Sequence, residues 1–122
     1  MGATFDDLRI LKLAEELADE IWVRVARWND FPKDVVGKQL ARAVDSIGAN
    51  IAESYGRFHF GEKLQFLYYA RGSIFESRYW INRAAARGLL GEADSKSFLD
   101  KLTVLAKQLN SFAAGLKSAR KS

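Results

Sequence analysis

Apolar residues recur at steps of three and four along almost the whole chain, which is the spacing of one face of a helix. In the first segment this face consists of Leu11, Ala14, Ala18, Ile21, Val25 and Trp28. In the last segment it consists of Phe98, Leu102, Leu105, Leu109, Phe112 and Leu116, an a/d pattern held for most of three heptads. The pattern predicts a helix at each end of the chain.

Turn signals divide the periodic pattern into four helices. The first, "NDFP", contains the only proline, and the residue before a proline is disfavoured in a helix. "YGRFHFG" and "RGLLGEADS" supply the other two breaks. We expect helices over about 5–29, 33–57, 62–87 and 93–117, followed by a basic, frayed tail at 117–122. Because the connections are short, the prediction is one all-α domain, an antiparallel up-down-up-down four-helix bundle.

The third predicted helix is apolar on more sides than a bundle requires. Its core stripe is Leu64, Leu67, Ile74, Ile81 and Ala85, and the aromatic residues Phe66, Tyr69, Phe75, Tyr79 and Trp80 lie largely outside it. Two explanations stay open: wide burial within one bundle with a few exposed rings, or cover by a second subunit. We favour the second, with a homo-oligomer interface that contains Arg71, Phe75, Arg78, Tyr79 and Trp80.

Polar residues accompany the apolar stripe of the second helix in "SIGANIAESYGR", residues 46–57. The polar strip is Ser46, Asn50, Glu53 and Arg57, and the third helix offers a matching strip of Gly72, Ser73 and Glu76. A glycine inside a helix indicates close approach of another backbone. We expect the strips to face each other, with Asn50 and Glu53 bonded to Ser73, Arg57 or a freed backbone group. Such contacts would fix the register of the two helices.

The charge is unevenly distributed along the chain, which has a net charge of +4. Residues 1–20 carry six acidic and two basic residues, whereas residues 96–122 carry six basic residues against one acidic residue. This asymmetry favours an anionic partner such as nucleic acid, and solvated helix faces are the alternative. The candidate phosphate contacts are Arg57, Lys63, Arg83, Arg87, Lys107, Lys117, Arg120 and Lys121.

The composition excludes most metal and catalytic sites. With no cysteine and one histidine, His59, the chain lacks the ligands of a structural zinc or di-iron site. Glu53 and Glu76 could form a carboxylate pair for acid–base chemistry or a divalent ion, but salt bridges are the favoured role. We expect no catalytic residue, metal or cofactor. With neither a membrane-length apolar run nor a signal-peptide pattern, the sequence predicts a cytoplasmic protein.

Several stretches resemble one family, the four-helix-bundle proteins of large-subunit ribosomal RNA intervening sequences. These stretches are "FDDLRILKLAEELADEIW", "FP", "QLARAVDSIGANIAESYGR" and "FLYYARGSIFE", over about residues 5 to 90. The most specific elements are Asn-Ile-Ala-Glu at Asn50–Glu53 and Gly-Ser-x-x-Glu at Gly72–Glu76. Ser54 replaces the usual glycine, and the stretch between Pro32 and Gln39 is short, so the local geometry at these two places stays open.

The resemblance implies a bacterial homopentamer, a ring of four-helix bundles with a central channel. It also implies kinship with the accessory variability determinant of diversity-generating retroelements, a basic pentamer that binds nucleic acid and a reverse transcriptase. Three functions follow for testing. The first is a non-enzymatic nucleic-acid-binding module, with RNA favoured. The second is an adaptor that docks a protein such as a reverse transcriptase on the acidic residues Glu15, Glu16, Asp19 and Glu20. The third is a carboxylate enzyme that uses Glu53 and Glu76.

Overall fold

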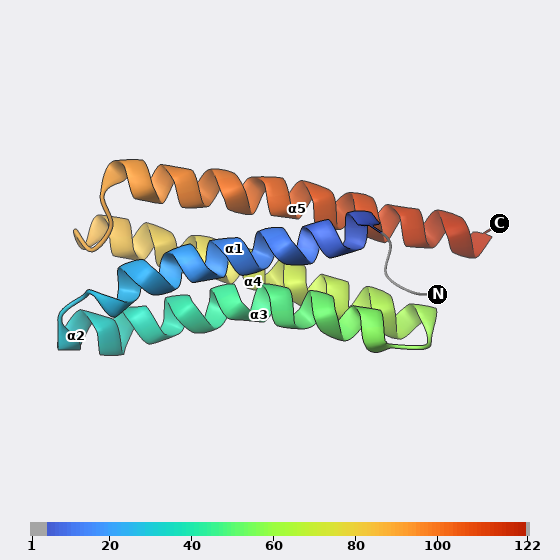
Figure 1. Ribbon diagram of the computed structural model, residues 1–122, viewed down its shortest axis with the longest axis horizontal. Coiled ribbons are helices and arrows are strands. Elements are labelled where there is room, and N and C mark those ends of the chain that lie inside the picture. The colour runs from blue at the N-terminus through green and yellow to red at the C-terminus, as the bar shows by residue number, and fades with distance from the viewer. Residues whose placement is uncertain (1–4, 122) are drawn as a thin grey trace.

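The computed structural model describes residues 5–121, with side chains for residues 8–120, and over this range the chain is a four-helix bundle (Figure 1). The long helices are α1 (Phe5–Ala26), α3 (Lys38–Gly56), α4 (Phe60–Ala86) and α5 (Glu92–Lys121). A one-turn helix α2 (Asp30–Pro32) and a short π-helix η1 (Lys33–Gly37) connect α1 to α3. No strand occurs within residues 5–121. The predicted all-α, up-down-up-down fold is confirmed.

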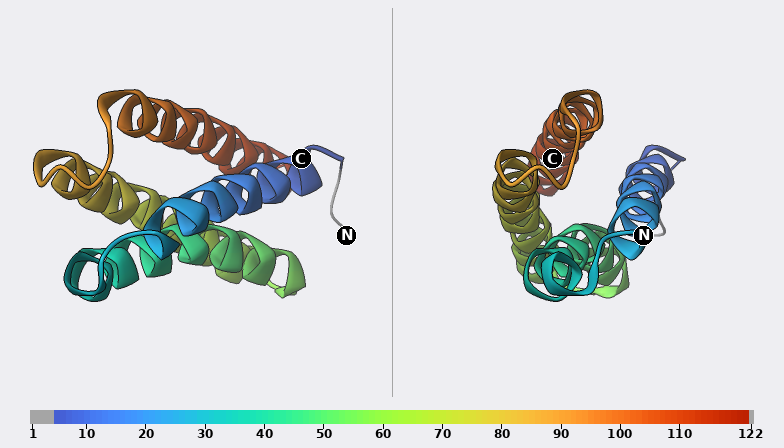
Figure 2. Two further views of the ribbon diagram at one scale, coloured as in Figure 1. Left: turned by 60° about the vertical axis from the view of Figure 1, so that its left-hand side comes forward. Right: turned by 90° about the vertical axis from the view of Figure 1, so that its left-hand side faces the viewer.

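Each long helix runs antiparallel to the one before it (Figures 1 and 2). Helix α3 packs against both α1 and α4, and α4 packs against α5. The α1–α5 pair has the smallest contact of the four neighbouring pairs, and the two helices lie farthest apart in the end-on view of Figure 2. None of the helices within residues 5–121 contains an apolar stretch of the length that a membrane span requires.

The apolar faces read from the sequence form the core. Among the largest fully buried side chains are Leu17, Ile21, Leu40, Ile47, Ile51, Leu67, Ile74, Ile81, Phe98, Leu102 and Leu105. The first four a/d residues of α5 are at most 2% exposed, and Phe112 and Leu116 pack against the core edge. The a/d pattern therefore identified the buried face of α5 correctly.

The helix ends differ from the prediction in two places. The predicted tail at 117–122 is helical through Lys121, so α5 is one continuous helix. Pro32, expected to lie between two helices, belongs to α2, where the Asn29 carbonyl accepts a hydrogen bond from the Lys33 amide at 3.0 Å. Proline is tolerated there because the first-turn amides of a helix have no partner within the helix.

Close helix packing occurs at a different glycine from the one expected. A Cβ on Gly72 would meet nothing within 4 Å, so the predicted approach of a neighbouring helix of this chain is wrong. A Cβ on Gly37 would lie 2.7 Å from Cγ1 of Val25, whose side chain is buried. Glycine is therefore needed at position 37, because a side chain there would overlap Val25 where η1 packs against α1.

Candidate nucleic-acid interface

Five cations lie in the half of the bundle that carries the α3–α4 turn and the last turns of α5. They are Arg57, Lys63, Arg71, Lys117 and Arg120. We call the region that these five residues form the basic end. The antiparallel packing of α4 on α5 places the start of α4 beside the end of α5, and both lie at the right of Figure 1. Residues separated by about 50 positions in the sequence therefore share one surface.

Aromatic rings support the cations on this surface. The guanidinium of Arg120 lies over the Phe60 ring, 4.8 Å from its centroid. The Tyr68 ring carries two cations, with Arg71 at 5.0 Å and the Lys117 ammonium at 5.5 Å. A cation–π contact orients a cation for about 0.5–1 kcal/mol at an exposed site and does not neutralise its charge. These side chains keep their N–H donors available to an anion.

Two of the predicted phosphate contacts instead hold the α3–α4 turn together. Lys63 Nζ donates hydrogen bonds to the carbonyls of Ser54 and Tyr55, at 3.3 and 3.5 Å, in the last turn of α3. Arg57 forms the predicted ion pair with Glu53, and its Nη1 also lies 3.6 Å from a carboxylate oxygen of Glu62. Arg57 therefore has its charge largely matched.

The remaining predicted contacts do not join the basic end. Arg83 and Arg87 lie near the C-terminal end of α4, and Arg83 is about 30 Å from Lys63 along the helix axis. Lys107 is exposed midway along α5. The side chain of Lys121 lies outside those described. The eight predicted residues consequently do not form a single surface.

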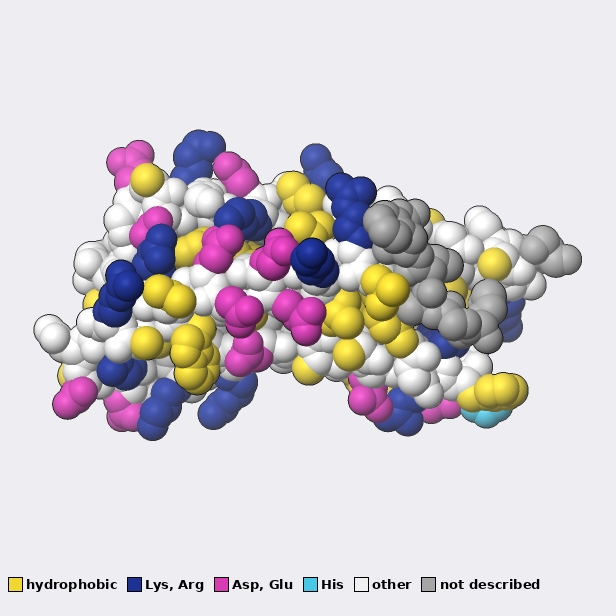
Figure 3. All heavy atoms as spheres, in the orientation of Figure 1, with side chains coloured by type: hydrophobic (Ala, Val, Ile, Leu, Met, Phe, Trp, Pro, Cys, Tyr) yellow, Lys and Arg dark blue, Asp and Glu magenta, His cyan; other side chains and the backbone are white. Residues whose placement is uncertain are grey.

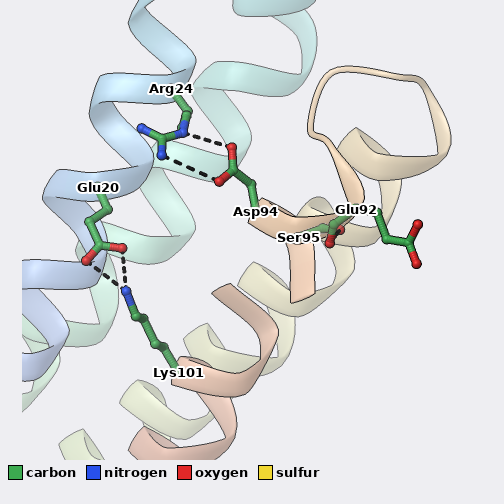
Figure 4. A network of polar contacts seen from close by, with 6 residues as sticks. All are labelled: Glu20, Arg24, Glu92, Asp94, Ser95 and Lys101. Carbon is green, nitrogen blue, oxygen red and sulfur yellow. Dashed lines mark hydrogen bonds and ion pairs between the residues drawn. The ribbon is translucent and has the colours of Figure 1, made fainter. Parts of the chain in front are cut away.

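Two cations at the opposite end of the bundle pair with carboxylates of a facing helix. Arg24 of α1 donates to Asp94 of α5 at 2.9 Å, and Lys101 of α5 lies 2.7 Å from Glu20 of α1 (Figure 4). The hydrogen bond from Arg24 lowers the pKa of Asp94. These two ion pairs connect α1 with α5, the helices with the smallest mutual contact.

The polar strips of α3 and α4 meet at one point. The hydroxyl oxygens of Ser46 and Ser73 lie 2.7 Å apart, within hydrogen-bonding distance. Asn50 Nδ2 donates to the Ser46 carbonyl of its own helix at 2.8 Å, so its predicted bond to α4 or Arg57 is wrong. Glu76 is exposed. An i−4 carbonyl satisfies the Asn50 amide locally and removes the need for a partner across the interface.

The predicted oligomer interface separates into exposed and internal residues. Phe75 and Tyr79 are 63% and 57% exposed on the outer face of α4, and Arg71 is exposed as well. Arg78 instead donates to Thr103 Oγ1 of α5 at 2.9 Å, and Trp80 packs against the core. Arg78 and Trp80 thus have partners within the chain. Of the predicted interface residues, Arg71, Phe75 and Tyr79 remain exposed and available to a second subunit.

A groove between α1 and α3 is acidic. Its lining includes four acidic residues against one basic residue, Lys12, together with small residues such as Ala14, Ala18 and Gly48. The acidic residues are Glu15, Glu16, Asp19 and Asp45. Figure 3 shows acidic side chains gathered in the middle of this face. Burial raises the pKa of Asp45, and the negative charge of Asp19 raises it further. Asp45 comes from the second predicted helix, and no pattern in the sequence indicates that it joins the acidic residues of the first.

The described side chains include no group of three or more His, Asp or Glu residues placed to hold a metal ion.

Comparison with known proteins defines the family. The model of the 23S rRNA-intervening sequence protein family matches residues 6–111. The chain belongs to this family. The match extends beyond residue 90, where the resemblance in the sequence ended, and includes most of α5.

A solved structure supports the fold of this family member. It is a 1.70 Å crystal structure of a protein of unknown function from the S23 ribosomal protein family of Bacteroides thetaiotaomicron. It superposes with a TM-score of 0.83 at 23% sequence identity, over 90% of this chain and 99% of that chain. No curated protein matches the chain significantly. The resemblance read from the sequence is confirmed at the level of family and fold.

Proposed function

We propose that this protein is a non-enzymatic RNA-binding module of the cytoplasm that contacts RNA through its basic end. One observation carries the proposal. Lys117 and Arg120 are exposed, are supported by aromatic rings and form no salt bridge with a described side chain. Charges of this kind are suited to phosphate, because bound RNA would not have to displace a carboxylate. The family's name refers to an intervening sequence of 23S rRNA, and this favours RNA over DNA.

The proposal is tested by fluorescence anisotropy of a labelled structured RNA at several salt concentrations. Wild-type protein should bind with an affinity whose logarithm falls linearly with the logarithm of salt concentration, by about 0.7–0.9 per neutralised phosphate. Lys117→Glu/Arg120→Glu should weaken binding by roughly ten- to a hundredfold at low salt and flatten the slope by about 1.5.

A matched charge reversal at the opposite end controls for net charge. Lys38 and Lys96 are exposed and pair with Asp34 and Asp100, each four residues away in the sequence. Lys38→Glu/Lys96→Glu changes the net charge by the same amount as Lys117→Glu/Arg120→Glu and should have a much smaller effect on affinity. Equal losses in the two double variants would contradict a localised site, and absence of binding by wild-type protein at low salt would contradict the function.

The outer face of α4 is the proposed interface between copies of the chain, in a homo-oligomer that the family resemblance makes a pentamer. Tyr68, Gly72, Phe75 and Tyr79 follow one another there at steps of four, three and four, which is an a/d seam. The open space above Gly72 would allow a helix of a second copy to approach closely. An oligomer would repeat the basic end in every subunit and strengthen binding by avidity.

Native mass spectrometry tests the proposed assembly. Phe75→Glu/Tyr79→Glu should convert the oligomer to monomers, because each substitution places a charge in the apolar seam. Phe31→Glu is the control, since Phe31 is 78% exposed at the opposite end of the bundle and lies outside the seam. An unchanged oligomer in Phe75→Glu/Tyr79→Glu would exclude this face as the interface.

The acidic α1–α3 groove favours one alternative, a protein-binding adaptor. A basic helix would complement Glu15, Asp19 and Asp45 there, and a reverse transcriptase is the partner that the resemblance to the accessory variability determinant offers. The adaptor would replace the RNA-binding proposal if wild-type protein bound no RNA at low salt but bound a basic partner, and if Glu15→Gln/Asp19→Asn abolished that interaction.

A further inference from the structure

The α3–α4 turn presents one aromatic ring to solvent. Phe58 is 90% exposed, more than any other large apolar side chain of the described residues. In Figure 3 the histidine of this turn, the only one in the chain, marks the lower right tip of the molecule, with hydrophobic atoms projecting beside it. The ring contributes little to the core, so stability does not explain a phenylalanine at this position.

The backbone beneath Phe58 is fixed on both sides. Arg57 and His59 both have extended conformations, with φ/ψ of −84°/140° and −81°/138°. The ion pairs of Arg57 with Glu53 and Glu62 and the hydrogen bonds of Lys63 to the end of α3 join the two helices across the turn. An exposed ring on a constrained turn needs little further ordering when it binds a ligand.

The surroundings of the ring suit a nucleotide. The His59 ring meets it edge to face, with centroids 5.3 Å apart and an interplanar angle of 88°. Two residues along the chain, Phe60 supports the guanidinium of Arg120. A planar face next to phosphate-binding cations is the arrangement by which proteins hold single-stranded nucleic acid, with bases stacked on aromatic rings and the backbone tracked by basic residues.

We infer that the basic end binds unpaired RNA, with a base stacked on Phe58. This inference rests on the proposed RNA-binding function and specifies the form of its ligand. Both faces of a base inside a duplex are already covered by its neighbours, so only a loop, a bulge or a single-stranded end offers a face to the ring. A duplex would contact the cations alone.

The test compares two RNA probes and five proteins. The probes are a single strand of about 12 nucleotides carrying 2-aminopurine and the blunt duplex of the same sequence. Wild-type protein should bind the single strand more tightly and change its 2-aminopurine fluorescence. Phe58→Ala should weaken single-strand binding by roughly five- to a hundredfold, the loss expected for one stacked base, and should leave duplex binding unchanged. Phe58→Trp should retain tight binding, because the indole also stacks.

Phe31→Ala is the matched control, because it removes an equally apolar, largely exposed ring from the opposite end of the bundle. Its affinity for both probes should equal that of wild-type protein. If single-strand binding survives in Phe58→Ala but falls in Lys117→Glu/Arg120→Glu, the inference is overturned and the proposed function stands. If wild-type protein binds neither probe at low salt, both are overturned.

Discussion

The two ends of the bundle use the same kinds of cation in different ways. At the opposite end, Arg24 and Lys101 pair with carboxylates of the facing helix and connect α1 to α5. At the basic end, Lys117 and Arg120 lie over aromatic rings and no carboxylate matches their charge among the described side chains. Arg24 and Lys101 therefore stabilise the fold, whereas Lys117 and Arg120 remain available to a ligand. The partners of a basic residue therefore indicate its role better than its position in a charged stretch does.

The largest expected contrast between the ends is in RNA affinity. Arg83→Glu/Arg87→Glu reverses two cations near the C-terminal end of α4, and Lys117→Glu/Arg120→Glu reverses two at the basic end. Fluorescence anisotropy at low salt should show a loss below about threefold for the first pair and roughly ten- to a hundredfold for the second. A larger loss of affinity for the Arg83→Glu/Arg87→Glu variant would place the RNA site at the opposite end of the bundle and contradict our proposal.

The next effect concerns the close packing of the opposite end. Gly37→Ala should lower the free energy of unfolding by about 1–3 kcal/mol, because the added methyl would overlap the buried Val25 side chain. Gly72→Ala should raise it by up to about 1 kcal/mol, because alanine is the better helix former and the space there is open. Urea denaturation of the two variants measures both changes in the free energy of unfolding. A Gly72→Ala variant that unfolds as a monomer more readily than wild type would contradict this assignment.

The smallest effects are electrostatic and depend on pH. The pKa of Asp94 is lowered in the folded protein, so its stabilisation is present above the ordinary value of 3.8 and is lost as pH falls through the lowered pKa. The pKa of Asp45 is raised, so its ionised form destabilises the fold at neutral pH, and that penalty disappears as pH falls towards 3.8.

Thermal unfolding at several pH values tests these signs. At pH 7, Asp94→Asn should lower Tm slightly and Asp45→Asn should raise it slightly. Both differences should shrink at acidic pH, where the wild-type carboxyls become protonated. If both variants changed Tm in the same direction at pH 7, the destabilising effect assigned to ionised Asp45, whose pKa is raised by burial and by Asp19, would be contradicted.

Periodicity predicted most of the fold, because burial of an apolar face is a local property of the sequence. Phe98, Leu102, Leu105 and Leu109 show this in α5. The same periodicity could have predicted which of the two glycines, Gly37 or Gly72, lies on a buried helix face. Gly37 lies three residues before the buried Leu40, whereas Gly72 lies two residues from both Ala70 and Ile74 and so falls off the core stripe.

The candidate site was less predictable, because ion pairing depends on how helices pack. Arg57 and Arg120 look equally available in the sequence, and both lie over rings, yet only Arg57 pairs with carboxylates of described side chains. In the sequence, Phe58 appears only as part of the helix-breaking stretch "YGRFHFG". Its exposure became visible once the turn had been placed between α3 and α4.

Ultraviolet crosslinking of a bound single-stranded RNA, followed by mass spectrometry of the crosslinked peptides, tests the central claim most directly. Our account predicts crosslinks in two segments that are distant in sequence and adjacent in space, residues 57–71 and 117–121, with Phe58 among the modified residues. Crosslinks concentrated instead in residues 83–101, at the opposite end of the bundle, would contradict it.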